Sequence, residues 1–308
     1  MIEIKGVSKK FNTNLALDNI SFNVKQGEVL GFLGPNGAGK TTTMKIITGF
    51  WQASEGTVIV EGTNVAEDSL AVRKKIGYLP ETVPLYDEMK VFEYLKFVAG
   101  VRDIPKEKII PRIKEVIESC GLQQVIGKSI EELSKGFRQR VGLAQAIMHD
   151  PDILILDEPT TGLDPNQIVE IRDLIKKVGK EKTVIFSTHI LAEAQATCDR
   201  VVIINKGKIV GEGRPDELAN AMNRNNYCLK VKGPQDSVLL ILRALPGILS
   251  VEVVEPEVDG LYEYKIQPKP GVDIREQIAS RMQDNNWLIF EFSKQSASLE
   301  EVFRELTK

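Results

Sequence analysis

The chain has 308 residues, of which 42% are hydrophobic and 27% are charged, with a formal net charge of −3. This composition is typical of a globular protein with a sizeable core, and without a basic excess it argues against nucleic acid as a partner. The sequence contains no apolar stretch of the roughly 20 residues that a membrane helix needs and no signal peptide, and its three scattered cysteines lack metal-ligand spacing.

A glycine-rich turn lies near the start of the chain, between a predicted strand and a predicted helix. The short apolar run at 28–33 predicts a buried strand, and the segment 42–49 predicts a helix that ends at a glycine. The turn at 34–41 matches the pattern G-x-x-x-x-G-K-[ST]. Strand, turn and helix N-terminus together point backbone N–H groups at a phosphate, so a phosphate loop is favoured over an ordinary turn.

The side chains of this turn predict how a nucleotide would be held. Gly34, Gly37 and Gly39 are expected to have positive φ and to let the backbone approach the anion. Lys40 is expected to reach the β- and γ-phosphates, and Thr41 to bind Mg²⁺. The residues expected to bind the nucleotide here are Gly34, Pro35, Asn36, Gly37, Ala38, Gly39, Lys40, Thr41 and Thr42.

The middle of the chain is predominantly helical. Residues 1–80 predict short strands around the phosphate loop, whereas 85–145 predict helices, with amphipathic candidates at 91–98 and 109–120. Because strands precede and follow it, this region predicts a helical subdomain inserted into an α/β sheet. Ser134 is a good N-cap for its last helix. Such a capped N-terminus can bind an anion, although alone it indicates only a capped amphipathic helix.

Two later apolar strands, at 153–156 and 184–188, are followed by polar side chains. Fully apolar runs suit parallel strands buried on both faces, and ligands bind beyond the carboxyl ends of such strands. Since adjacent strand residues point in opposite directions, Asp157 and Glu158 are expected to have different roles. Asp157 suits the water shell of Mg²⁺, Glu158 suits polarisation of the attacking water, and His189 suits contact with the γ-phosphate. Without the other motifs, a turn before a proline would explain the acidic pair equally well, and a lone histidine is more often a surface or capping residue than a catalytic one.

The sequence changes character beyond residue 218. The polar segment 220–226 resembles a linker, and the elements after it follow the order β-α-β-β-α-β of a small ferredoxin-like sandwich. The sequence therefore predicts an α/β domain over 1–220, with its helical subdomain at about 85–145, and an accessory α+β domain over 221–308. The accessory elements are expected at 227–231 (strand), 236–245 (helix), 248–254, 261–266 (strands), 273–285 (helix), 288–292 (strand) and 299–306 (helix).

The motifs of residues 1–220, taken in order, resemble the ABC transporter ATPase family. The octapeptide 133–140 resembles the signature motif of that family, which closes over a nucleotide held by a second copy of the protein. The resemblance implies an α/β fold, namely a P-loop ABC ATPase core with an inserted helical subdomain. It also implies that ATP and Mg²⁺ are the cofactors and that the chain forms a homodimer with a second ATPase subunit.

The resemblance assigns further residues. Phe11 lies where the family stacks adenine, and Asp164 lies in a segment that resembles the D-loop, which contacts the dimer partner. Glu81 lies where the family usually has a glutamine that senses Mg²⁺ and couples to the membrane subunit. A carboxylate there can still contact metal or water, so Glu81 is a candidate catalytic and metal residue. The signature residues expected at the nucleotide are Ser134, Gly136 and Gln139.

The resemblance also implies a location and a partner. The chain is expected in the cytoplasm, peripheral on the inner face of the cell membrane, where it drives an integral membrane permease on a separate chain. Among subgroups it is similar to single-domain ATPases of bacterial export systems, and in particular to the gliding-motility-associated ABC ATPase of Bacteroidetes-type bacteria. The segments behind that similarity are 31–40, 77–81 and 134–140.

Two other functions stay open. A soluble family member that acts on a macromolecular partner is disfavoured because the chain has one set of motifs and no sustained heptads. A binding module that has lost hydrolysis is disfavoured because the residues expected to carry the chemistry are all present.

Overall fold

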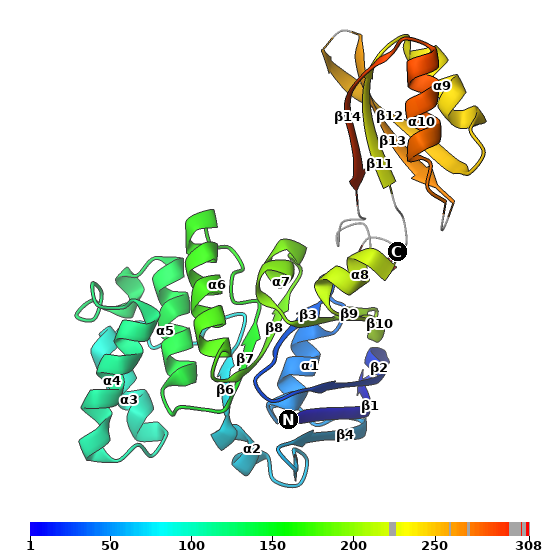
Figure 1. Ribbon diagram of the computed structural model, residues 1–308. Coiled ribbons are helices and arrows are strands. Elements are labelled where there is room, and N and C mark those ends of the chain that lie inside the picture. Colours follow the sequence, from blue (N-terminus) through cyan, green and yellow to red (C-terminus); the bar gives the residue numbers. More distant parts are fainter. Residues whose placement is uncertain (222–225, 259, 270–271, 296–302, 304–305, 308) are drawn as a thin grey trace. The chain divides into compact units, whose positions relative to one another are not determined.

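The computed structural model describes residues 1–221, 226–258, 260–269, 272–295, 303 and 306–307 (Figure 1). The chain divides into two compact units, Met1–Pro215 with Leu306–Lys308 and Asp216–Glu305. Buried side chains form two hydrophobic clusters in the first unit and a separate cluster in the second.

The larger unit is built on a six-stranded sheet with the order β10–β9–β3–β8–β7–β6, in which only the β10–β9 pair is antiparallel. Every residue of β3, β7 and β8 is buried, as expected for parallel strands covered on both faces. The bounds are β3 (Val29–Leu33), β6 (Ile76–Leu79), β7 (Ile153–Asp157), β8 (Thr183–Thr188), β9 (Arg200–Asn205) and β10 (Lys208–Gly213).

The carboxyl ends of the central strands meet at one edge of this sheet. Leu33 at the end of β3 pairs with Thr188 of β8, and Asp157 of β7 pairs with Ser187. The phosphate loop, the acidic pair and His189 therefore all leave the sheet at the same edge. This register agrees with the arrangement predicted from the sequence.

A second sheet is antiparallel, with the order β2–β1–β4–β5. Its two long strands differ from the short strands expected, since β1 has 10 residues and β2 has 11. A helix that the sequence did not predict, α2, lies between this sheet and β6. It has 7 residues, of which only Val72 is buried, so it is too short to give a clear helical period. The bounds are β1 (Ile2–Phe11), β2 (Asn14–Val24), β4 (Glu55–Val60), β5 (Thr63–Asn64) and α2 (Ser69–Lys75).

Helices cover both faces of the six-stranded sheet. The helix α1 (Lys40–Ile47) packs into a cluster shared with the antiparallel sheet and with Ile153 and Ile155 of β7. The alternate residues Leu154 and Leu156 belong to the other cluster, which includes α6 (Pro165–Gly179) and the helical region. Because β7 is apolar on both faces, its alternate residues pack into a different cluster on each side of the sheet. A further helix of this unit is α7 (Leu191–Thr197), whereas α8 (Pro215–Ala221) spans the boundary between the two units in the chain.

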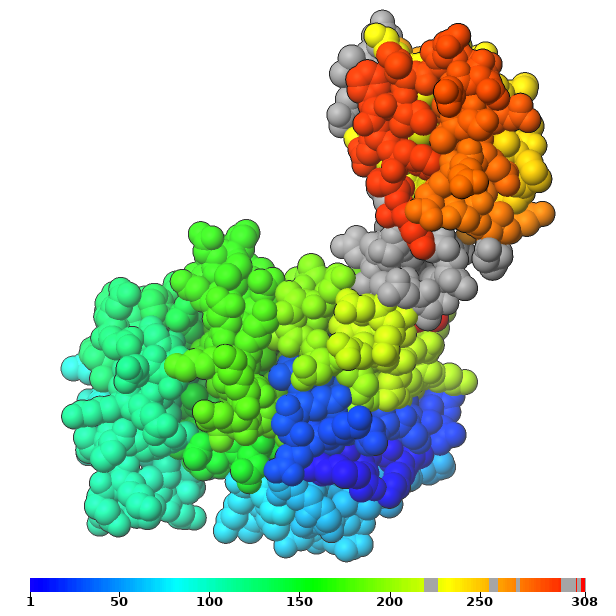
Figure 2. All heavy atoms as spheres, viewed as in Figure 1, coloured from blue at the N-terminus to red at the C-terminus, as the bar shows by residue number. Residues whose placement is uncertain are grey.

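The helical region lies between β6 and β7 in the chain, and the amphipathic segments expected at 91–98 and 109–120 fall within two of its helices. Figure 2 shows it as a lobe on one side of the larger unit. Tyr94, Leu95 and Val141 are among the residues that form its core. The bounds are α3 (Val91–Val101), α4 (Lys106–Cys120), η1 (Ile130–Glu132) and α5 (Lys135–Ile147).

The smaller unit has an antiparallel sheet with the order β12–β13–β11–β14 and two helices that share its core. Its elements follow the β-α-β-β-α-β order expected from the sequence. The helix expected at 299–306 lies almost entirely outside the described residues, as do residues 222–225 of the linker-like segment. The bounds are β11 (Asn226–Lys232), α9 (Gln235–Ala244), β12 (Ile248–Val258), β13 (Leu261–Pro268), α10 (Arg275–Asp284) and β14 (Leu288–Gln295).

None of the described helices is both long enough and apolar enough to cross a bilayer.

Candidate functional site

The phosphate loop joins β3 to α1, and its glycines serve different purposes. Gly37 has a φ of 78° and Gly39 a φ of 114°, both in the left-handed region expected for them. Gly34 is not among the residues with positive φ, so that expectation is wrong. A Cβ on Gly34 would lie 2.5 Å from the carbonyl oxygen of Ile204, and one on Gly39 would lie 2.7 Å from Leu17. Close packing is therefore what requires glycine at 34.

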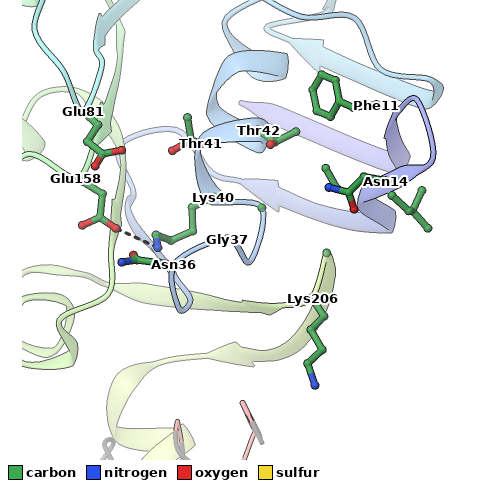
Figure 3. Close-up of a pocket in the computed structure, with 14 residues that line it drawn as sticks. Phe11, Asn14, Asn36, Gly37, Lys40, Thr41, Thr42, Glu81, Glu158 and Lys206 are labelled. Atoms are coloured by element: carbon green, nitrogen blue, oxygen red, sulfur yellow. Dashed lines mark ion pairs between the residues drawn. The ribbon is translucent and has the colours of Figure 1, made fainter.

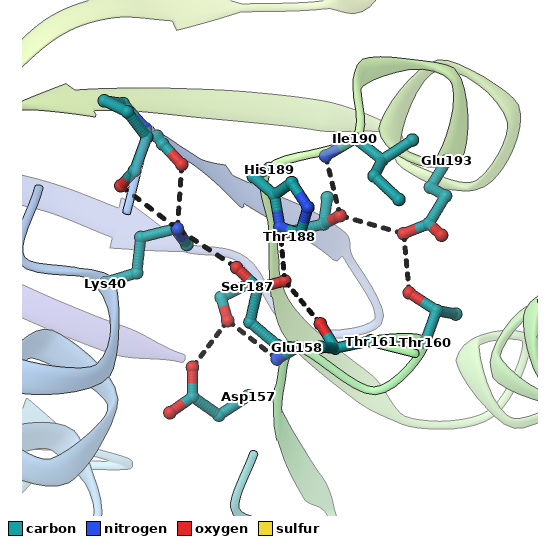
Figure 4. A network of polar contacts seen from close by, with 12 residues as sticks. Lys40, Asp157, Glu158, Thr160, Thr161, Ser187, Thr188, His189, Ile190 and Glu193 are labelled. Atoms are coloured by element: carbon teal, nitrogen blue, oxygen red, sulfur yellow. Dashed lines mark hydrogen bonds and ion pairs between the residues drawn. The ribbon is translucent and has the colours of Figure 1, made fainter. Parts of the chain in front are cut away.

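Lys40 begins α1, and its side chain is only 5% exposed. It donates a hydrogen bond to the carbonyl oxygen of Gly34 at 2.8 Å and a longer one to that of Pro35 at 3.3 Å. It also forms an ion pair with Glu158, 3.0 Å from Nζ to Oε1 (Figures 3 and 4). An incoming phosphate would therefore compete with the Glu158 carboxylate for this cation.

Glu158 follows β7 with a φ of 50°, an unusual value for a residue other than glycine. Its Oε2 lies 2.8 Å from Nδ1 of His189 and accepts a hydrogen bond from the Thr161 hydroxyl at 3.0 Å. Burial raises the pKa of the Glu158 carboxyl, but the Lys40 charge and the hydrogen bonds from Lys40 and His189 outweigh it and leave the pKa below 4.5. Glu158 is thus a carboxylate at neutral pH, as a general base requires.

Asp157 is fully buried and faces different neighbours from Glu158, as alternation along the strand predicts. Its Oδ1 accepts a hydrogen bond from the Ser187 hydroxyl at 2.6 Å. Among the described residues its Oδ2 has no hydrogen-bond partner. Burial raises the pKa of Asp157, and the hydrogen bond from Ser187 opposes that rise.

These features fit a Mg²⁺ ion held mainly by the nucleotide. In the described part of the chain no group of three or more acidic, cysteine or histidine side chains forms a metal site. Mg²⁺ is commonly held by one or two carboxylates together with substrate phosphates and water. The Thr41 hydroxyl and the unpartnered oxygen of Asp157 would supply the protein side of such a site.

A cavity of about 680 Å³ opens beside these groups, a size that suits a nucleotide (Figure 3). Glu81 and Glu158 lie on one side of it, near Lys40, and Phe11 and Asn14 lie on the other. The lining residues are Phe11, Asn14, Leu15, Ala16, Asn36, Gly37, Gly39, Lys40, Thr41, Thr42, Glu81, Glu158, Lys206 and Gly207.

Sequence reasoning missed five lining residues, at 14–16 and 206–207. Residues 14–16 begin β2 and residues 206–207 form the β9–β10 turn, and neither segment matches a motif. The positive φ of Gly207 reflects a turn that its Lys-Gly pair signals only weakly. Phe11 lines the cavity with its ring edge-to-face against Trp51, the two centroids 4.9 Å apart. This contact supports the ring on which an adenine would stack.

The signature residues lie elsewhere in the larger unit. The Ser134 hydroxyl caps α5, and Ser134, Gly136 and Gln139 do not line the cavity. A Cβ on Gly136 would lie 2.6 Å from the side chain of Gln167, whose backbone N–H donates to Asp164 at 2.9 Å. The signature segment and the segment around Asp164 are therefore neighbours within one chain. Neither segment lines the cavity beside the phosphate loop of the same chain.

A phosphate loop, a Lys40–Glu158 pair and a buried aspartate at the carboxyl edge of a parallel sheet define a P-loop nucleotide-binding protein. Residues 17–161 match the family model described as ABC transporter. The chain is 36% identical over 290 residues to the ABC transporter ATP-binding protein YhcH of Bacillus subtilis (strain 168), covering 87% of this chain and 92% of that relative. It therefore belongs to the family of ABC transporter ATP-binding proteins, whose members are ATPases that hydrolyse ATP.

Other relatives and solved structures support the same family membership. The linearmycin resistance ATP-binding protein LnrL of Bacillus subtilis (strain 168) is 32% identical, with 83% of each chain covered. A structure of the ATP binding subunit of an ABC transporter superposes with a TM-score of 0.66 and 30% identity, covering 72% of this chain and 93% of that one. The dimeric cassette MJ0796 gives a TM-score of 0.65 and 27% identity, covering 70% and 98%.

Proposed function

We propose that two copies of this chain close around MgATP and use its hydrolysis to drive a separate membrane permease. The observation that carries the proposal is the division of the site within one chain. The phosphate loop, Glu158 and His189 lie together, while Ser134 and Gly136 do not line the same cavity. A second copy would supply the missing signature segment, and the dimeric cassettes among the structural relatives support that arrangement.

In the proposed reaction each side chain has one task. Lys40 leaves Glu158 and binds the β- and γ-phosphates. Thr41 and Asp157 would hold Mg²⁺, which would supply positive charge against the phosphates. Glu158 then accepts a hydrogen bond from the attacking water. His189, now paired with Glu158 through Nδ1, is oriented so that its other ring nitrogen can contact the γ-phosphate. No phosphoenzyme forms, because water attacks the phosphorus directly.

The remaining predicted residues bind and sense the nucleotide. Phe11 stacks on adenine, and Glu81 lines the cavity where a metal-bound water would be in reach. From the partner, Ser134, Gly136 and Gln139 contact the γ-phosphate at a helix N-terminus, and Asp164 contacts the opposing subunit. The helices between β6 and β7 act as an inserted subdomain that carries this signature segment.

The permease is proposed to dock at a groove of about 740 Å³ between α2 and α3. Apolar side chains that line it are unusually exposed, 45% for Phe97 and 57% for Tyr86. Such a patch indicates a binding surface, and basic side chains around it suit an acidic or carbonyl-rich segment of the partner. Its exposed apolar residues are Leu70, Tyr86, Phe97 and Val101, and its basic residues are Arg73, Lys74 and Arg102.

A functional complex of this kind would lie on the inner face of the cell membrane. Residues 221–308 are proposed to form an accessory ferredoxin-like domain that adjusts dimerisation or permease docking. The relative named for linearmycin resistance supports an exporter. The similarity to gliding-motility ATPases is a narrower hypothesis, which the identity of the permease tests.

Two measurements test the proposal. Lys40→Ala removes the cation that balances the phosphate charge, and it should abolish tight ATP binding and phosphate release. Unchanged ATP affinity would refute the assignment of the nucleotide site.

Purification from detergent extracts should recover an integral membrane protein with the wild-type chain. Phe97→Asp should lose that protein and keep ATP binding. Ile110→Asp is the matched control, since Ile110 is 43% exposed in the same helical region but does not line the groove.

A further inference from the structure

Glu193 is a buried carboxylate that none of the sequence motifs explains. It lies in the first turn of α7, just after His189, and is only 2% exposed. Burying a carboxylate is unfavourable unless hydrogen bonds replace its lost water. Its contacts therefore indicate why a carboxylate is needed there.

One oxygen of Glu193 binds two hydroxyl groups from different parts of the chain (Figure 4). Oε2 accepts a hydrogen bond from Thr160 Oγ1 at 2.9 Å and from Thr188 Oγ1 at 2.8 Å. Both threonines are buried, at 3% and 0% exposure. Oε1 has no hydrogen-bond partner within the described part of the chain. The whole contact is thus made through one oxygen atom.

The two threonines belong to the segments that carry the hydrolytic side chains. Thr160 follows Glu158 by two residues, and Thr188 immediately precedes His189. Glu158 and His189 are 2.8 Å apart between Oε2 and Nδ1, and Glu158 has a φ of 50°. A residue with such a backbone persists only where its surroundings restrain it. Glu193 provides a restraint that reaches both segments at once.

We infer that Glu193 is a positioning residue for ATP hydrolysis, which ties Thr160 to Thr188 and so holds Glu158 and His189 at their working separation. The inference rests on the proposed roles of Glu158 and His189. Glu193 itself does not line the nucleotide cavity, so it acts through the two threonines and not by contact with ATP. A displacement of about 1 Å at a reacting group can cost about a hundredfold in rate.

The test compares Glu193→Ala with Glu193→Gln by steady-state ATP hydrolysis of the full chain. Alanine removes both hydrogen bonds, and kcat should fall by about tenfold to a hundredfold while KM changes little. Glutamine keeps an oxygen that can accept from both threonines, so it should restore most of kcat. Thr197→Val is the matched control. Thr197 is on the same helix, and its buried hydroxyl has no partner among the described residues, so kcat should stay unchanged.

Each outcome decides between a positioning and a merely structural role. The inference is overturned if Glu193→Ala keeps the wild-type kcat, if only KM rises, or if Glu193→Gln is as slow as alanine. Should Glu193→Ala fail to fold, Thr160→Val removes one hydrogen bond alone, and its kcat must fall for the inference to stand. Glu158→Gln is measured in parallel. If Glu158→Gln retains turnover, the proposed function fails. If Glu158→Gln is inactive and Glu193→Ala is fully active, the inference about Glu193 fails and the proposed function stands.

Discussion

The ion pair between Lys40 and Glu158 makes a specific prediction for nucleotide affinity. Both side chains are almost fully buried, at 5% and 6% exposure, and their charged atoms are 3.0 Å apart. ATP must displace the carboxylate to reach the ammonium. Glu158→Gln removes the competing charge and leaves Lys40 with the carbonyl oxygens of the loop. The variant should therefore bind ATP more tightly than the wild type, besides hydrolysing it more slowly.

The expected gain in ATP affinity follows from the loss of the ion pair between Lys40 and Glu158. At 3.0 Å two unit charges attract by about 5.5 kcal/mol with an effective dielectric constant near 20, before desolvation is counted. The net value of a hydrogen bond to a charged group is about 1.5–3 kcal/mol, which corresponds to about tenfold to a hundredfold in affinity. Loss of the general base should lower the hydrolysis rate by a factor of about 10²–10⁴.

Titration with a non-hydrolysable ATP analogue, at protein concentrations low enough to avoid dimerisation, measures the affinity. Trp51 contacts Phe11 at the cavity, so its fluorescence is a suitable signal in a Trp287→Phe background. Glu81→Gln is the control, because it removes a carboxylate from the same cavity that has no ion pair with Lys40 among those described. Its affinity should rise by no more than about fivefold, as for an exposed charge. If the two variants bind the ATP analogue with equal affinity, the proposed competition between Glu158 and the phosphates for Lys40 is refuted.

Three further predictions concern other parts of the chain. Glu81→Gln should preserve or raise ATPase activity and leave transport intact in a reconstituted complex, and loss of ATP binding would contradict the assignment. Burial and the Arg102 charge lower the pKa of His149 from 6.5 to about 4, so the unfolded chain binds the extra proton and stability is lost as pH falls from 6.5 towards 4. Denaturant unfolding at pH 5 should show the wild type about 2 kcal/mol more destabilised, relative to pH 7.5, than His149→Gln. A chain that ends at Ala219 should stay soluble and bind ATP with altered turnover or weaker dimerisation; an insoluble or nucleotide-dead product would mean that the remaining segment completes the ATPase core.

The sequence predicted the parts of the site that depend on local pattern and strand direction. Apolar strands ending at Asp157 and Thr188 had to be parallel and adjacent for their polar ends to meet, and they are. Three features depend on the surrounding fold, and no local sequence pattern predicts them. They are the Lys40–Glu158 pair, the packing of Gly34 against Ile204 and the left-handed backbone of Glu158.

The hydrogen bonds that link Thr160 to Thr188 through Glu193 could not be predicted from the sequence either. A glutamate in the first turn of a helix is ordinary on a solvated surface, and nothing in the pattern around it distinguishes a buried one. Only the fold brings Thr160 and Thr188 to the same oxygen. The cavity-lining residues 14–16 and 206–207 were missed for the same reason, since they line the cavity only because the fold brings them beside the phosphate loop.

The central claim is that two chains share each ATP, and light scattering of Glu158→Gln with MgATP tests it most directly. Slow hydrolysis should trap ATP between two copies, so the mass should rise from the 34.3 kDa of one chain to twice that value. The same protein without nucleotide, and Lys40→Ala with MgATP, should both remain at the mass of one chain. If Glu158→Gln saturated with MgATP stays monomeric at high concentration, alone and with its permease, the shared site is contradicted.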